Sequence, residues 1–226
     1  MLYDPKVQVN DPDFEKEIRE FEKEPIEKGK IMFYGDSNFT RWKKQYGNVN
    51  LEDVILGKDG SKVAINHGFG GSTAEQQLYY YDRAVKPWAP RALVLSTFAN
   101  DAGKGYTATE IFFLQARLMA YARTDIPGIK FFLCNTKPNL TTAGRGLVRK
   151  VTMAEYNELC ADYCLKHDDA YLINRHDWAE LYDKPENVGD YEHVRKDLFI
   201  EDNTHFNPEG YGLYTKFFIK ELDSIL

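Results

Sequence analysis

Residues 31–37, IMFYGDS, decide the fold, because they begin with a short apolar run and end with glycine and two polar residues. A continuous apolar run of this length, bounded by turn-forming residues, is typical of a strand buried on both faces of a sheet. Four similar runs follow along the chain, at residues 63–66, 92–97, 129–136 and 170–174. The sequence therefore predicts five buried strands.

Segments with helical periodicity separate the predicted strands. They lie at residues 73–85, 107–123, 152–167 and 208–225. Buried strands that alternate with helices form parallel sheets, since the helices cover both faces of the sheet. We therefore predict an α/β fold, a three-layer α/β/α sandwich with a five-stranded parallel sheet.

A further helix is expected before the first strand. Residues 11–21 open with Asp-Pro, a favourable helix start, and carry apolar side chains at helical spacing. No linker rich in proline, glycine or serine divides the chain. We expect one domain over residues 1–226, with residues 1–29 as an N-terminal helical extension.

The charge and the hydropathy of the chain exclude two classes of partner. The 226 residues include 29 basic and 35 acidic side chains, a formal net charge of −6. Nucleic-acid binding normally needs clustered positive charge, so we expect no nucleic-acid partner. The apolar runs are far shorter than the about 20 residues that cross a bilayer, so we expect no membrane partner.

The cysteines and the N-terminus indicate a cellular compartment. Cys134, Cys160 and Cys164 are odd in number and match no zinc-binding spacing. We expect reduced thiols and no metal. No basic start followed by an apolar block is visible at the N-terminus, so we expect a cytoplasmic protein. The sequence does not specify the oligomeric state.

Polar or glycine-rich clusters follow four of the predicted strands. Gly35-Asp36-Ser37 follows the first strand, residues 66–72 (NHGFGGS) the second, and Asn100-Asp101 the third. Residues 202–211 follow the fifth strand after a long connection, 175–204. The carboxyl ends of parallel strands meet at one edge of a sheet, where ligands bind. We therefore expect these clusters to converge there.

The residue types in these clusters fit ester hydrolysis. This reaction needs a nucleophile, a base that takes its proton and a group that orients the base. Ser37 can be the nucleophile and His205 the base, since a neutral imidazole titrates in the right range. Asp202, three residues before His205, can hold the ring in the useful tautomer.

Three groups can stabilise the oxyanion that forms on the substrate. They are the Ser37 backbone N–H, the Gly71 backbone N–H and the Asn100 side-chain amide. Glycine lets the backbone approach the substrate closely, and an amide donates a hydrogen bond without needing protonation.

These residues carry a resemblance to a known family. The chain resembles the SGNH hydrolases, also called the GDSL esterase/lipase family, in which the catalytic serine lies in a Gly-Asp-Ser block, here residues 35–37. Gly71 and Asn100 match the two later oxyanion-hole blocks, and Asp202-x-x-His205 matches the last block. The resemblance implies a flavodoxin-like sheet of order 2-1-3-4-5, no metal or organic cofactor, and carboxylic ester hydrolysis through a Ser-His-Asp triad and an acyl-enzyme.

One departure from the family pattern bears on the substrate. The third block usually reads Gly-x-Asn-Asp, whereas here Phe98 stands in the glycine position. We expect Phe69 and Phe98 to form walls of the substrate pocket, with Phe98 narrowing it. A short acyl group, acetyl above all, on a carbohydrate or other small polar alcohol is therefore the expected substrate.

Other interpretations remain open at this point. The same chemistry serves a lysophospholipase, a thioesterase or an acyltransferase, and the same fold serves a non-catalytic small-molecule binding protein or a flavodoxin-like FMN protein. Arg145 and Arg149 are expected to be solvated loop charges, with contact to a polar substrate as the alternative. His67, beside the glycine run, is expected to take no part in the chemistry. Ser37 can alternatively cap a short helix.

Overall fold

The structure is a computed structural model that describes residues 14–226. Its centre is a parallel sheet of five strands in the order β2-β1-β3-β4-β5. The strands are β1 (Ile31–Gly35), β2 (Ala64–Gly68), β3 (Ala92–Ser96), β4 (Lys130–Cys134) and β5 (Ala170–Ile173). The predicted α/β sandwich and its strand order are confirmed.

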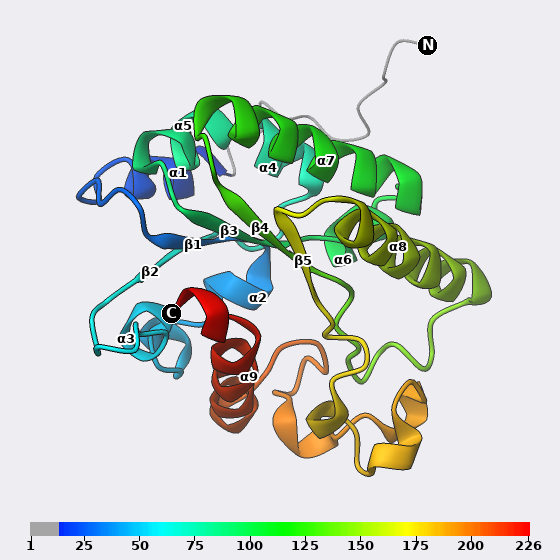
Figure 1. Ribbon diagram of the computed structural model, residues 1–226. Coiled ribbons are helices and arrows are strands. Elements are labelled where there is room, and N and C mark those ends of the chain that lie inside the picture. Colours follow the sequence, from blue (N-terminus) through cyan, green and yellow to red (C-terminus); the bar gives the residue numbers. More distant parts are fainter. Residues whose placement is uncertain (1–13) are drawn as a thin grey trace.

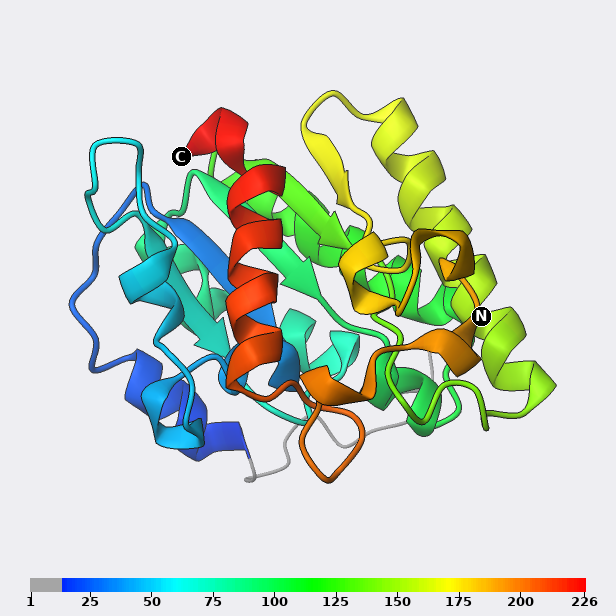
Figure 2. The same ribbon diagram turned by 90° about the horizontal axis from the view of Figure 1, so that it is seen from below.

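Helices cover both faces of the sheet (Figure 1). One layer holds α1 (Glu15–Phe21), α4 (Ala74–Tyr79), α5 (Tyr81–Ala84), α7 (Ala108–Asp125) and α8 (Leu147–Lys166), with α6 (Ala99–Gly103) beneath α7. The other layer holds α2 (Ser37–Thr40), α3 (Leu51–Val54) and α9 (Pro208–Glu221). Figure 2 shows α9 lying across this second face.

Short 3-10 turns complete the connections. They span Lys44–Tyr46, Lys86–Trp88, Ala179–Leu181, Pro185–Asn187, Tyr191–His193, Lys196–Leu198 and Asp223–Ile225. Four of them lie in the long connection between β5 and α9, which packs beside α9 on the second face (Figure 2).

Alternate side chains of each buried strand supply two separate cores. In β1, Ile31 and Phe33 pack toward α2, α3 and α9, whereas Met32 and Tyr34 pack toward α1 and α5. All four side chains are fully buried. Burial on both faces explains why the sequence of β1 is continuously apolar.

Helix α1 packs against the sheet on the same face as α5. Ile18 and Phe21 of α1 are buried in the same core cluster as Met32 and Tyr34. The expected helix start at Asp11-Pro12 lies outside the described residues, and α1 begins at Glu15.

The boundaries of the predicted helices differ from those in the structure, most clearly in two of them. The segment 73–85 divides at Tyr80 into α4 and α5. The helix expected at 152–167 begins five residues earlier, at Leu147. Leu147 and Val148 in its first turn are largely exposed, so they add nothing to the buried stripe from which helices are predicted.

Candidate active site

The end of β1 places Ser37 at the carboxyl edge of the sheet. Gly35 is needed there, because a Cβ at this position would lie 2.4 Å from the backbone oxygen of Ser96 on β3. The Asp36 carboxylate caps α2 by accepting a hydrogen bond of 2.9 Å from Asn38 N–H. Asp36, and not Ser37, is therefore the helix cap, which leaves the Ser37 hydroxyl available for other contacts.

A tight loop before α9 presents His205. Asp202 Oδ1 accepts hydrogen bonds from the backbone N–H groups of Thr204 and His205, each 2.9 Å long. The loop is closed by Ile200 N–H, which donates to the oxygen of His205 at 3.0 Å. The Tyr211 hydroxyl of α9 then donates to the backbone oxygen of Asn38 at 3.0 Å. These bonds fix the histidine loop against α2.

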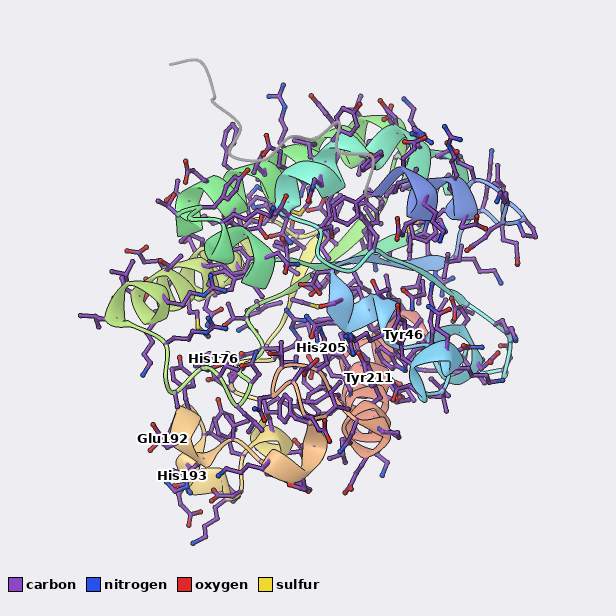
Figure 3. The ribbon with its side chains drawn as sticks, turned by 180° about the vertical axis from the view of Figure 1, so that it is seen from behind. Tyr46, His176, Glu192, His193, His205 and Tyr211 are labelled. Carbon is purple, nitrogen blue, oxygen red and sulfur yellow. The ribbon has the colours of Figure 1, made fainter. Side chains whose placement is uncertain are left out.

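Ser37, His205 and Asp202 form a continuous hydrogen-bonded line. Ser37 Oγ lies 2.8 Å from His205 Nε2, and His205 Nδ1 lies 2.6 Å from Asp202 Oδ2. A carboxylate can only accept, so Nδ1 carries the proton and Nε2 accepts from the serine hydroxyl. Figure 3 shows His205 below α2, near Tyr211.

Local interactions keep this pair in the required charge states. Burial alone would raise the pKa of Asp202, but hydrogen bonds from the backbone and ring of His205 and from Thr204 lower it to about 2. Burial lowers the pKa of His205 below its ordinary value, and the charges of Arg41 and Lys137 act in the same direction against the opposing effect of Asp202. At neutral pH the imidazole is therefore neutral and able to accept a proton.

Gly71 and Asn100 lie on neighbouring turns. Gly71 has a φ of +89°, which favours glycine. A Cβ at the preceding residue, Gly70, would lie 3.5 Å from the Ser37 Cβ, so this turn passes beside the serine. Asn100 Nδ2 donates to the Ser72 oxygen at 2.9 Å, which uses one of its two N–H groups. Within residues 14–226, neither Ser37 N–H nor Gly71 N–H has a hydrogen-bond acceptor.

A buried carboxylate organises the turn that carries Asn100. Asp101 is fully buried and accepts hydrogen bonds from Ala74 N–H at 2.7 Å, from the Thr97 hydroxyl at 2.7 Å and from Phe98 N–H at 3.2 Å. It thus joins the end of β3 to the start of α4. Burial raises the pKa of Asp101.

Phe98 adopts a backbone conformation that favours glycine. Its φ is +114°. This observation explains why the family pattern has glycine at this position. The ring is buried and packs against Tyr156 of α8 in a tilted arrangement, with ring centroids 5.2 Å apart, so packing holds the backbone in this conformation.

A cavity of about 210 Å³ opens beside the serine. It is lined by Ser37, Asn100, His205 and Phe98, and otherwise mostly by polar side chains from the connections that follow β4 and β5. A cavity of this size is smaller than the roughly 300–1,000 Å³ of sites that hold drug-sized ligands.

The structure corrects one expectation about the pocket. Phe69 is not a wall of this cavity but is fully buried among Phe21, Tyr34 and Tyr80 on the opposite side of the sheet. His67 is buried on that same side, where Nδ1 lies 2.6 Å from the oxygen of Ala84.

Four arginine and lysine residues line the cavity, and two of them were not predicted from the sequence. Arg145 and Arg149 line it, as in the alternative interpretation of these residues. Lys137 and Arg175 line it too, and they follow the ends of β4 and β5 closely. Their position just after predicted strands places them at the edge of the sheet where ligands bind, but a single basic residue there has no pattern that distinguishes it from other loop residues. His193, in contrast, lies at the outer end of the long connection (Figure 3).

Two further features of the described residues concern metals and membranes. Residues 14–226 contain no group of three or more His, Cys, Asp or Glu side chains placed to hold a metal ion. None of the helices within that range combines the length and apolar character that a membrane crossing requires.

Three solved structures with the same fold are named as a lipase and two esterases. A GDSL-like lipase from Bacteroides thetaiotaomicron has a TM-score of 0.68 at 16% identity, over 96% of this chain and 99% of that chain. The esterase EstA from Pseudoalteromonas sp. has a TM-score of 0.62 at 14% identity, over 87% and 97%. The acetyl xylan esterase AlAXEase has a TM-score of 0.64 at 17% identity, over 87% and 100%.

Sequence comparison gives the family. No curated protein sequence matches this chain. Residues 33–213, however, match the GDSL-like lipase/acylhydrolase family, and this segment runs from β1 through the histidine loop into α9. The chain belongs to the GDSL-like lipase/acylhydrolase family.

Proposed function

We propose that this protein is a serine esterase that hydrolyses esters of short acyl groups, acetyl above all, on a carbohydrate or other small polar alcohol. One observation carries the proposal, the hydrogen-bonded line of Ser37 Oγ, His205 and Asp202, with distances of 2.8 Å and 2.6 Å. A serine hydroxyl is a weak nucleophile, and an adjacent neutral imidazole that is oriented by a carboxylate activates it.

The reaction proceeds in two halves. Ser37 Oγ attacks the ester carbonyl carbon while His205 Nε2 takes the hydroxyl proton, which gives a tetrahedral oxyanion. The C–O bond to the alcohol then breaks, His205 returns the proton to the departing oxygen, and an acyl-serine remains. Water attacks the acyl-serine with His205 again as base, and the carboxylic acid leaves with Ser37 restored.

The oxyanion is stabilised by donors from three turns. The Ser37 and Gly71 N–H groups have no acceptor within residues 14–226, and Asn100 retains one N–H beyond its bond to Ser72. Donors that are fixed before the reaction stabilise the developing charge most, because they need no reorganisation.

The size and walls of the cavity support a short acyl group. The acyl part and the alcohol part of the ester must both fit into about 210 Å³, and Phe98 lines this cavity. The polar lining suits a polar alcohol. An acetyl xylan esterase is among the structures with this fold.

The test is hydrolysis of p-nitrophenyl acetate, butyrate and octanoate by the wild-type protein and by Ser37→Ala. The matched control is Ser61→Ala, which removes an exposed serine from a surface turn. We expect Ser37→Ala to lower kcat by about 10³-fold or more, the scale found when other serine hydrolases lose their nucleophile. Ser61→Ala should keep the wild-type rate, and acetate should be the best of the three substrates.

Two results would contradict the proposal. Equal activity of wild type and Ser37→Ala would remove this serine from the reaction. A folded wild-type protein that hydrolyses none of the three esters would favour a binding protein on the same fold.

A further inference from the structure

The cavity beside Ser37 is strongly basic, although the whole chain carries a net charge of −6. Its lining includes the cations of Lys137, Arg145, Arg149 and Arg175 and a single carboxylate, Asp36. That carboxylate already accepts two hydrogen bonds from Asn38. The field inside the cavity is therefore positive.

Within the described residues, the four basic side chains of the cavity differ from several others in the absence of a carboxylate partner. Within residues 14–226, none of them lies within 4.0 Å of a carboxylate oxygen. Five other arginines of that range do form ion pairs, namely Arg19, Arg41, Arg83, Arg123 and Arg195. Within that range, three of the five arginines that form no ion pair line this cavity, so an anion that enters it would not compete with a protein carboxylate for them.

Arg145 and Arg149 have most of their donors available. Within residues 14–226, the Arg145 side chain donates only to the Thr141 hydroxyl, and the Arg149 side chain only to the oxygen of Ala99 at 2.7 Å. A guanidinium has five N–H donors in a planar fork that matches a carboxylate, phosphate or sulfate. The Arg149 guanidinium also lies 5.0 Å from the centre of the Phe98 ring, which fixes its position in the wall of the cavity.

The position of these arginines is unfavourable for the helix that carries them. Arg149 is in the first turn of α8, Arg145 lies just before it, and that turn holds no acidic residue. Cations at a helix N-terminus oppose the helix dipole, which favours negative charge there. A bound anion would reverse the sign of this interaction.

The cavity cations also repel one another, which makes their charged forms less stable. Burial and the neighbouring charge of Arg175 lower the pKa of Lys137 to about 7. Burial and the charge of Arg145 lower the pKa of Arg149. An anion that enters the group relieves the repulsion between these cations, although not the effect of burial.

We propose that the natural ester carries an anionic group, a carboxylate, phosphate or sulfate, which Arg145 and Arg149 bind while Ser37 attacks the ester carbonyl. This inference rests on the proposed function and names the substrate class of the same site. Arg175 and the protonated fraction of Lys137 add further positive charge to the lining of the same cavity.

The experiment compares charged and neutral esters of matched shape. One pair places the charge on the alcohol side, 3-acetoxybenzoate against its methyl ester. The other places it on the acyl side, 4-nitrophenyl hydrogen succinate against its methyl ester. The readout is the ratio of kcat/KM for the charged ester to that for the neutral ester, which cancels any general damage to the site.

The variants are Arg145→Gln, Arg149→Gln and the control Arg117→Gln. Arg117 is an exposed arginine of α7 that donates to Tyr121 and lines no part of the cavity. For at least one pair, we expect wild type to prefer the charged ester and each cavity variant to lower the ratio about tenfold, the effect of one hydrogen bond to a charged group. Arg117→Gln should keep the wild-type ratio. Added salt should lower the wild-type ratio as well.

The outcomes separate this inference from the proposed function. Ser37-dependent hydrolysis with no charge preference in either pair, or with a preference that both cavity variants retain, would overturn the inference and leave the esterase intact. Absence of hydrolysis of all four esters would overturn both. Arg145 is exposed, so we expect Arg145→Gln to fold. This variant therefore tests the inference even if Arg149→Gln does not fold.

Discussion

At Phe98 an unfavourable backbone conformation is offset by favourable packing of the side chain. Its φ of +114° is unfavourable for any residue with a Cβ, at a cost of about 1–3 kcal/mol. The ring compensates by packing on Tyr156 in a buried cluster with α7 and α8. The turn that presents Asn100 therefore depends on the packing of a side chain at a position whose backbone favours glycine.

This balance can be measured by two substitutions at the same position. Phe98→Gly and Phe98→Ala both lose the ring, which costs about 3–5 kcal/mol. Only glycine removes the strain of the positive φ. The greater conformational freedom of glycine in the unfolded chain offsets about 0.5–1 kcal/mol of that gain. We expect Phe98→Gly to be more stable than Phe98→Ala by about 1 kcal/mol in urea unfolding, the reverse of the usual order. Both variants should also hydrolyse longer acyl esters better, relative to acetate, than wild type does.

An alanine variant as stable as the glycine variant would show that residue 98 is not strained. Unchanged exclusion of longer esters in both variants would show that the ring does not limit the acyl group.

At the scale of elements, the continuous apolar runs predicted the strands well, because burial on both faces leaves no polar positions in them. The strand ends were less predictable. β2 continues to Gly68, two residues beyond the predicted end at residue 66. Ile65, His67 and Phe69 therefore alternate toward the same core, which is why Phe69 is buried there and not in the cavity.

The candidate site was predictable as far as its residues lie in short sequence blocks. Ser37 and Asn100 lie in blocks that follow β1 and β3, whereas His205 lies in the Asp-x-x-His block just before α9. Arg175 was not predictable, because a single basic residue after a strand has no distinguishing pattern. Its role depends on three-dimensional neighbours that the sequence does not show, such as Tyr214 of α9.

The position of α2, and with it of Ser37, depends on close contact with β2. A Cβ at Gly68 would lie 2.5 Å from Thr40 N and 2.7 Å from the Phe39 Cβ. We expect Gly68→Ala to push α2 away, to destabilise the protein by about 1–3 kcal/mol and to lower esterase activity more than tenfold, a scale set by the sensitivity of catalysis to misplacement of about 1 Å.

The matched control for this prediction is Gly212→Ala in α9. A Cβ there meets nothing within 4 Å, and residue 212 is exposed. Alanine is favoured over glycine inside a helix by about 1 kcal/mol, so this variant should unfold at slightly higher urea with unchanged activity. Equal behaviour of the two variants would mean that α2 tolerates displacement.

At the scale of the whole molecule, Arg175 joins the sheet to the second helical layer. From the end of β5 its guanidinium donates to the oxygen of Asn135 after β4, to Ser96 Oγ on β3 and to the Tyr214 hydroxyl on α9. The side chain is 1% exposed. A buried arginine with several acceptors positions all of them, since each loses its partner when the guanidinium is removed.

Arg175→Met should therefore destabilise the molecule as a whole. We expect a loss of about 3 kcal/mol or more in the free energy of unfolding, because each buried group left without a partner costs about 1–3 kcal/mol. The control, Arg117→Met on the surface of α7, should stay within about 0.5 kcal/mol of wild type. Urea unfolding followed by far-ultraviolet circular dichroism measures both. Equal stability of the two variants would mean that the buried arginine contributes only its charge to the cavity, and that the second helical layer is held to the sheet by apolar packing alone.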